Sequence, residues 1–191
     1  RARLWQKRGN GYLARLFASQ KACSSSADHF ELLAIPRHFD IDLKALENSY
    51  KKLQQKHHPD QYATKTKEEQ DRAAAESATI NAAYEVLRDP LQRARYMLQD
   101  SSTDDGTEEY VIEDPVLLME VMDLQELIDS TEDQDKLKRI YHDVESSYRS
   151  FVGSVSAAFE EECPSGVQKS IHCLSYYDKL RKSVLAKMDA Q

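Results

Sequence analysis

The chain has 191 residues, of which 40% are hydrophobic and 31% charged, and its formal net charge is -7 at pH 7. No apolar run approaches the roughly 18 residues that a membrane-spanning helix needs, so no membrane association is expected. The acidic balance would repel phosphate groups, so nucleic acid is not an expected partner. Cys23, Cys163 and Cys173 form no CxxC pair. We therefore predict neither a metal site nor a cofactor.

Residues 1–27 form a basic leader with six positive side chains and no acidic one. The remaining residues carry 20 positive against 33 negative side chains, so the rest of the chain is strongly acidic. Leu13, Leu16 and Phe17 lie at helical spacing in the leader, and three serines follow at residues 24–26. Such a composition is typical of an organellar transit peptide. A merely basic, disordered arm is the alternative.

Beyond the leader, apolar residues recur mostly at spacings of three and four, and glycine and proline are few, which predicts an all-α protein. Residues 30–35 form a short apolar segment that Pro36 stops. The next helix is expected from about Asp42, its N-cap, to His57. Its predicted buried stripe comprises Leu43, Leu46, Tyr50 and Leu53. A longer helix is expected from Lys67 to Arg88, where Asp89 and Pro90 follow, and a short one covers residues 91–98.

Residues 99–113 are polar and acidic without periodicity, which indicates a linker. Three further helices are expected over about 114–129, 132–161 and 167–188, with a turn at residues 163–166. The first has an apolar stripe of Leu117, Val121, Leu124 and Ile128. The second has a seam of Leu137, Tyr141, Val144, Tyr148, Phe151, Val155 and Ala158. The third is expected to bury Val167, Ile171, Leu174, Val184 and Leu185. Residues 114–191 therefore predict an antiparallel three-helix bundle.

Three motifs follow one another in residues 28–98. They are His58-Pro59-Asp60 between two expected helices, the segment Asn81-Ala82-Ala83-Tyr84-Glu85-Val86-Leu87 in the second of them, and Asp89-Pro90 with Arg93 after it. With these motifs, residues 28–98 resemble a J-domain. A J-domain is a helical hairpin that stimulates the ATPase of a DnaK-type chaperone and catalyses nothing itself. The resemblance implies that His58, Pro59 and Asp60 contact this chaperone. Four lysines on the solvated side of the preceding helix would attract an acidic patch on it: Lys44, Lys51, Lys52 and Lys56.

Several segments have a more specific sequence: residues 30–32, 53–60, 77–81 and 114–120, together with the acidic linker and the bundle after it. In these segments the chain resembles the HscB family of iron–sulfur co-chaperones. The family implies two partners, a DnaK/HscA-class chaperone and an IscU-type iron–sulfur scaffold protein. Positions matching the scaffold contacts are Leu118, Met122 and Tyr176, with Asp123 and Glu126 as polar neighbours. Glu120 departs from the basic residue that some members carry, and the CxxC zinc module of some eukaryotic members is not found.

Leu118 and Met122 lie off the core stripe of their helix, and Tyr176 points away from Val167, which favours a partner surface. A broader core is the alternative for these residues. For the whole chain, the alternatives are a J-protein with another client and a small hydrolase using His58 and Asp60, although no nucleophile accompanies that pair. The leader and the family together predict the mitochondrial matrix, with a cytosolic pool as a further alternative.

Overall fold

The computed structural model describes residues 28–57, 59–62, 64–101 and 114–190. Within these ranges the chain forms seven α-helices, one short 3-10 helix and no strand, which confirms the predicted all-α class. The predicted leader, residues 1–27, lies outside the described residues, as do residues 102–113 of the predicted linker. No described helix is both long and apolar enough to cross a bilayer.

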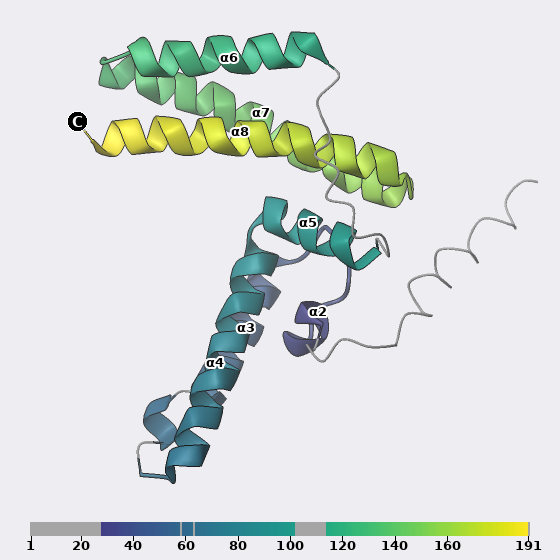
Figure 1. The fold of residues 1–191 in the computed structure, drawn as a ribbon, viewed down its shortest axis with the longest axis vertical. Coiled ribbons are helices and arrows are strands. Elements are labelled where there is room, and N and C mark those ends of the chain that lie inside the picture. The colour runs from purple at the N-terminus through teal and green to yellow at the C-terminus, as the bar shows by residue number, and fades with distance from the viewer. Residues whose placement is uncertain (1–27, 58, 63, 102–113, 191) are drawn as a thin grey trace, which may run out of the picture.

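The N-terminal part is a hairpin of two long helices, α3 (Leu43–His57) and α4 (Lys67–Arg88), with the short α2 (His29–Leu32) beside it (Figure 1). A compact apolar cluster holds these helices together: Phe30, Leu33, Ile35, Leu46, Ile80, Ala83 and Leu87. The bounds of α4 agree with the prediction, because Thr66 caps its first turn and Pro90 follows its C-cap, Asp89.

Leu43 does not belong to the buried stripe predicted for α3. Its side chain is 54% exposed, whereas Leu46, one turn further, is completely buried. Leu43 is the first residue of the helix, and Asp42 Oδ1 accepts a hydrogen bond from the N–H of Lys44 at 2.9 Å in the same turn. Helical periodicity predicts the direction in which a side chain points. It does not predict whether a neighbouring segment extends far enough along the helix to cover that side chain.

The helix α5 (Pro90–Ser101) leads from the hairpin to the C-terminal part and packs on both. It continues for one turn beyond residue 98, where the sequence predicted the domain to end and the acidic linker to begin. Residues 99–101 contain neither Gly nor Pro, so no helix-breaking residue stops the helix at residue 98. The helix predicted over residues 91–98 therefore extends three residues further than expected.

The C-terminal part is a three-helix bundle of α6 (Pro115–Ser130), α7 (Gln134–Glu160) and α8 (Pro164–Asp189) (Figure 1). Consecutive helices are antiparallel, so α6 and α8 run in the same direction. Asp114 and Asp133 cap α6 and α7 by accepting hydrogen bonds from backbone N–H groups of the first turn. The bundle core includes Ile128 from α6 together with Leu137, Val144, Val155, Val167, Leu174, Leu180 and Val184.

Two details of α8 differ from the prediction. The helix begins at Pro164, so the turn lies before it, where Glu162 adopts a φ of 53°. Proline suits the first position of a helix because the N–H that it lacks has no intrahelical partner there. Leu185, predicted to be buried, is 38% exposed, whereas Tyr177 and Leu180 are buried without having been assigned to the stripe.

The hairpin and the bundle share apolar packing. Phe39, from the loop before α3, and Leu91 and Ala94, from α5, belong to the core cluster of the bundle. The ring of Phe39 stacks on that of Phe159 in α7, with centroids 5.4 Å apart, and Asp40 accepts a hydrogen bond from Ser156 Oγ. The hairpin therefore projects from the bundle with its base held in place (Figure 1).

Candidate functional site

The connection between α3 and α4 lies at the end of the hairpin that is far from the bundle (Figure 1). Its described part contains the 3-10 helix η1 (Pro59–Tyr62). His58 lies outside the described residues, and Asp60 is exposed. The N–H of Lys65 donates to the carbonyl oxygen of Tyr62 at 2.9 Å, which closes the turn before α4. Asp60 is therefore accessible to a partner at this tip.

A capping box fixes the start of α4. The N–H of Glu69 donates to Thr66 Oγ1 at 3.4 Å, and the N–H of Thr66 donates to Glu69 Oε2 at 3.1 Å. The hydrogen bond from the Thr66 backbone stabilises the carboxylate and lowers the pKa of Glu69. Because two N–H groups of the first turn gain partners, the helix start is well defined, and so is the length of the connection.

Polar side chains join α3 to α4 between the apolar cluster and the tip. The rings of Tyr50 and Tyr84 stack at 4.1 Å, and Tyr50 Oη donates to Asn81 Oδ1 at 2.9 Å. Gln54 Nε2 also donates to Asn81 Oδ1, while Ser77 Oγ donates to Gln54 Oε1 at 3.2 Å. Asn81 and Tyr84, which carried the resemblance in the sequence, therefore have a structural role in the hairpin.

The four predicted lysines of α3 are all exposed: Lys44, Lys51, Lys52 and Lys56. Lys51 Nζ lies 2.7 Å from Glu47 Oε1, one turn earlier. This hydrogen bond raises the pKa of Lys51 and lowers that of Glu47. The charge of Lys51 is thus partly balanced within the helix.

Leu118 and Met122, predicted to contact a partner, are 41% and 62% exposed on α6. Leu117, Val121 and Leu124, by contrast, pack against the bundle core as the stripe predicted. Gln125, seven residues after Leu118, donates from Nε2 to Ser183 Oγ of α8 at 3.2 Å. Because residues seven apart share a helix face, Leu118 lies on the flank of α6 that adjoins α8.

Tyr176 lies seven residues before Ser183, so it occupies the matching flank of α8. Its side chain is partly buried, and Lys179 Nζ lies 5.4 Å from the centroid of its ring. Since α6 and α8 are parallel, Leu118 and Tyr176 lie at corresponding levels, two turns before the Gln125–Ser183 hydrogen bond. The structure therefore brings the apolar residues predicted on the two helices to one seam.

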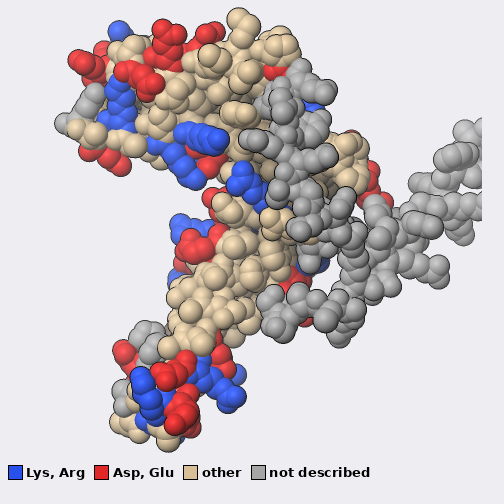
Figure 2. Space-filling view, in the orientation of Figure 1, with Lys and Arg blue, Asp and Glu red and all other residues tan. Residues whose placement is uncertain are grey.

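Asp123 and Glu126 extend the surface around α6 rather than along this seam. At about 100° per residue, Asp123 lies roughly 140° around the helix from Leu118, with Glu126 between the two. Figure 2 shows acidic side chains gathered over the C-terminal half of α6 and uncharged side chains over its N-terminal half. Glu126 therefore lies nearer to the apolar seam, whereas Asp123 lies further around α6, toward its other flank.

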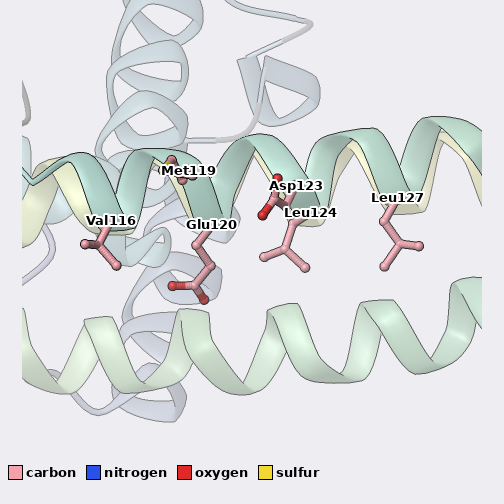
Figure 3. Close-up of a pocket in the computed structure, with 6 residues that line it drawn as sticks. All are labelled: Val116, Met119, Glu120, Asp123, Leu124 and Leu127. Atoms are coloured by element: carbon pink, nitrogen blue, oxygen red, sulfur yellow. The ribbon is translucent and has the colours of Figure 1, made fainter.

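A groove on the opposite flank of α6, facing α7, was not predicted (Figure 3). It has a volume of about 460 Å³ and is lined by Val116, Met119, Glu120, Asp123, Leu124 and Leu127. Tyr177 Oη donates to Glu120 Oε1 at 2.7 Å, and burial together with this bond raises the pKa of Tyr177. Glu120 is thereby held by α8. The sequence could have pointed to this groove through the apolar residues of α6 that lie outside its stripe. Val116 and Leu127 are among them, and both are exposed.

The fold and the two surfaces define a J-domain protein with a helical C-terminal domain. Residues 28–96 match the DnaJ domain, and residues 113–185 match the domain described as the HSCB C-terminal oligomerisation domain. The chain is 30% identical over 161 residues to the Co-chaperone protein HscB homolog of Vibrio campbellii, covering 82% of this chain and 94% of that one. The chain belongs to the HscB family of J-domain co-chaperones.

Other similar proteins carry HscB names as well. The Iron-sulfur cluster co-chaperone protein HscB homolog of Arabidopsis thaliana is 34% identical over 163 residues, covering 85% of this chain but only 64% of that protein. The crystal structure of human co-chaperone protein HscB superposes with a TM-score of 0.74 at 26% identity, covering 93% of this chain and 96% of that one. Chaperone HscB from Vibrio cholerae gives 0.72 at 27% identity, with 86% and 99% covered.

Proposed function

We propose that this chain binds an IscU-type iron–sulfur scaffold protein on its bundle and stimulates the ATPase of a DnaK/HscA-class chaperone through its hairpin tip. The observation that carries the proposal is that this chain matches both the DnaJ domain and the C-terminal domain of the HscB family. Residues 58–60 belong to the connection between α3 and α4, and Leu118, Met122 and Tyr176 occupy adjoining flanks of α6 and α8. In this role the protein activates another protein's ATPase and performs no catalysis of its own.

The physical basis is differential binding. A co-chaperone accelerates hydrolysis only if it binds one conformation of the chaperone more tightly than the others. His58 and Asp60 would contact the conformation that is ready to hydrolyse ATP. Lys44, Lys51, Lys52 and Lys56 would speed the encounter, because they present positive charge on the exposed side of α3.

The test is a steady-state ATPase assay with a DnaK/HscA-class chaperone and an IscU-type scaffold. His58→Gln and Asp60→Asn should abolish the stimulation while leaving scaffold affinity unchanged, because the tip is far from α6. Asp71→Asn is the matched control, since Asp71 is an exposed acid of α4 that pairs with Lys67 at 3.1 Å. Full stimulation by both tip variants would contradict the proposal. So would normal stimulation without scaffold binding, which would indicate another client.

For the cellular location we propose the mitochondrial matrix. The support is the composition of residues 1–27, which are rich in arginine and lysine and free of acid. Import of the complete precursor into isolated mitochondria, with protection from added protease, is the expected result. Residence in the cytosol alone would contradict this location.

A further inference from the structure

His57 is the last residue of α3, and its ring lies against α4. His57 Nδ1 is 2.7 Å from Glu76 Oε2, across 19 residues of sequence. The histidine side chain is 20% exposed and that of Glu76 46% exposed, so the contact is partly sheltered from solvent. The carboxylate can only accept, so Nδ1 is the donor in this hydrogen bond. Neither residue belongs to the predicted chaperone contacts.

This contact lies closer to the tip than the other contacts between α3 and α4 described above. The apolar cluster of the hairpin extends along α3 only as far as Leu53. Beyond it, Gln54 bonds with Ser77, and His57 then bonds with Glu76. The spacing of the two helices at the tip therefore depends on polar side chains rather than on apolar packing.

A second side-chain bond joins the tip to α3. Gln61 Nε2, from η1, donates to the carbonyl oxygen of Gln55 at 2.5 Å. Carbonyl groups in the last turn of a helix have no intrahelical donor, so this bond satisfies one of them. Residues 58–60 thus lie between two tethered positions, His57 on one side and Gln61 on the other.

We propose that the His57–Glu76 contact is a clasp that positions the chaperone-contacting residues at the tip. His57 and Glu76 act as positioning residues: they limit the conformations of the connection, so that a larger fraction of the complexes already formed with the chaperone presents His58 and Asp60 in the arrangement that activates hydrolysis. This inference rests on the proposed function of the tip. It concerns maximal stimulation rather than encounter, which the lysines of α3 govern.

The experiment uses the full chain and compares four variants. These are His57→Ala, Glu76→Ala, the double alanine variant, and a swapped variant that carries both His57→Glu and Glu76→His. Each alanine variant should lower maximal ATPase stimulation by about two- to fivefold, the range expected for loss of one partly exposed side-chain hydrogen bond. The concentration that gives half-maximal stimulation should stay within about twofold, because the lysine face is intact. The double alanine variant should give the same stimulation as each single variant, and the swapped variant should restore stimulation. Asp71→Ala, which breaks an ion pair within α4, should have no effect.

Amide hydrogen exchange on the free protein provides a second readout. The amides of residues 60–62 should exchange faster in both alanine variants, while those of α6–α8 should be unchanged. Unaltered stimulation in the alanine variants, additive losses in the double variant, or unaltered exchange at the tip would each overturn the clasp. If the wild-type chain gave no stimulation at all, the proposed function would fail, whereas the exchange data would still decide whether the clasp exists.

Discussion

The guanidinium group of Arg93 lies over the ring of Phe39, 4.9 Å from its centroid, where the hairpin meets the bundle. Arg93 is 5% exposed, and its Nη1 donates to the carbonyl oxygen of Leu87 at 2.6 Å. Burial lowers the pKa of Arg93, although the nearby carboxylates of Asp40 and Asp89 act in the opposite direction. A cation is thus accommodated between an aromatic ring and the end of α4, and it helps to fix the base of the hairpin.

Phe39→Ala should destabilise the whole protein by about 3–5 kcal/mol, because the ring packs in the bundle core and supports Arg93. Urea unfolding followed by circular dichroism measures the change in unfolding free energy. Leu43→Ala is the control: its side chain is 54% exposed, so a change within about 0.5 kcal/mol is expected. Equal effects of the two substitutions would show that Phe39 does not join the two parts.

Lys52→Glu should slow chaperone association by about two- to tenfold, with a smaller effect on dissociation, because exposed charges act mainly on encounter. Lys52 is preferable to Lys51, whose partner Glu47 would then face a like charge one turn away. Lys136→Glu, at an exposed position of α7 away from the hairpin, makes the same change in net charge and should have no effect. Stopped-flow rates between about 0.1 and 1 M salt, where the Debye length falls from about 10 to 3 Å, should converge for the variant and the wild type. Salt-independent association would reject this lysine face.

Leu118→Ala, Met122→Ala and Tyr176→Ala should each weaken scaffold binding by about 1–2 kcal/mol, as expected for residues near the centre of an interface. Their effect on unfolding free energy should be much smaller, because Leu118 and Met122 are exposed. Ile128→Ala is the reverse control: Ile128 is completely buried on the same helix, so a loss of about 2–5 kcal/mol in stability is expected. Calorimetric titration and thermal unfolding of the four variants provide both quantities. Stability losses without a change in affinity would place these residues in the core instead.

Tyr148→Phe should reduce the loss of stability at alkaline pH. Burial raises the pKa of Tyr148 from 10.0 to about 12. The folded state therefore holds the phenolic proton more tightly than the unfolded state, and this contribution is complete below about pH 10 and lost as the pH rises through about 12. Over that window the wild type should lose on the order of 2 kcal/mol more than the variant. Urea unfolding at several pH values measures the difference, and identical pH dependence would contradict it.

Tyr177→Phe provides a contrast at neutral pH. This substitution removes the hydrogen bond from Tyr177 Oη to Glu120 Oε1, so a loss of about 1 kcal/mol is expected there. Tyr148→Phe should change stability little at neutral pH, since the ring keeps its contact with Arg181, whose guanidinium carbon lies 4.3 Å from the centroid.

The sequence predicted those helices best whose ends carry local signals. The bounds of α4 were predicted correctly because Thr66 and Glu69 form a capping box and Pro90 prevents continuation. Asp114 and Pro115 likewise marked the start of α6. Phe39 was missed because it lies in an irregular segment without periodicity and packs on Phe159, 120 residues further along the chain. Local patterns contain no information about such a contact.

Exposure of the α6 residues could be predicted, but their neighbours could not. Leu118 and Met122 lie off the apolar stripe, and periodicity alone shows this. Which flank faces α8 depends on how the helices pack, which the Gln125–Ser183 bond reveals. The His57–Glu76 contact was equally inaccessible, since it depends on the register between α3 and α4. The roles assigned to residues 58–60 and to the α6–α8 surface stay predictions that the experiments above address.

The packing of Phe39, Leu91 and Ala94 into the bundle also sets the spatial relation between the two proposed binding surfaces. The tip and α6 cannot swing independently without exposing apolar side chains at the base of the hairpin. A scaffold held on α6 would therefore meet a chaperone held at the tip within a limited range of distances. Their encounter would then be intramolecular, at an effective concentration that the geometry of the junction sets. Two weak contacts can then act as one strong one, provided that the junction keeps its geometry.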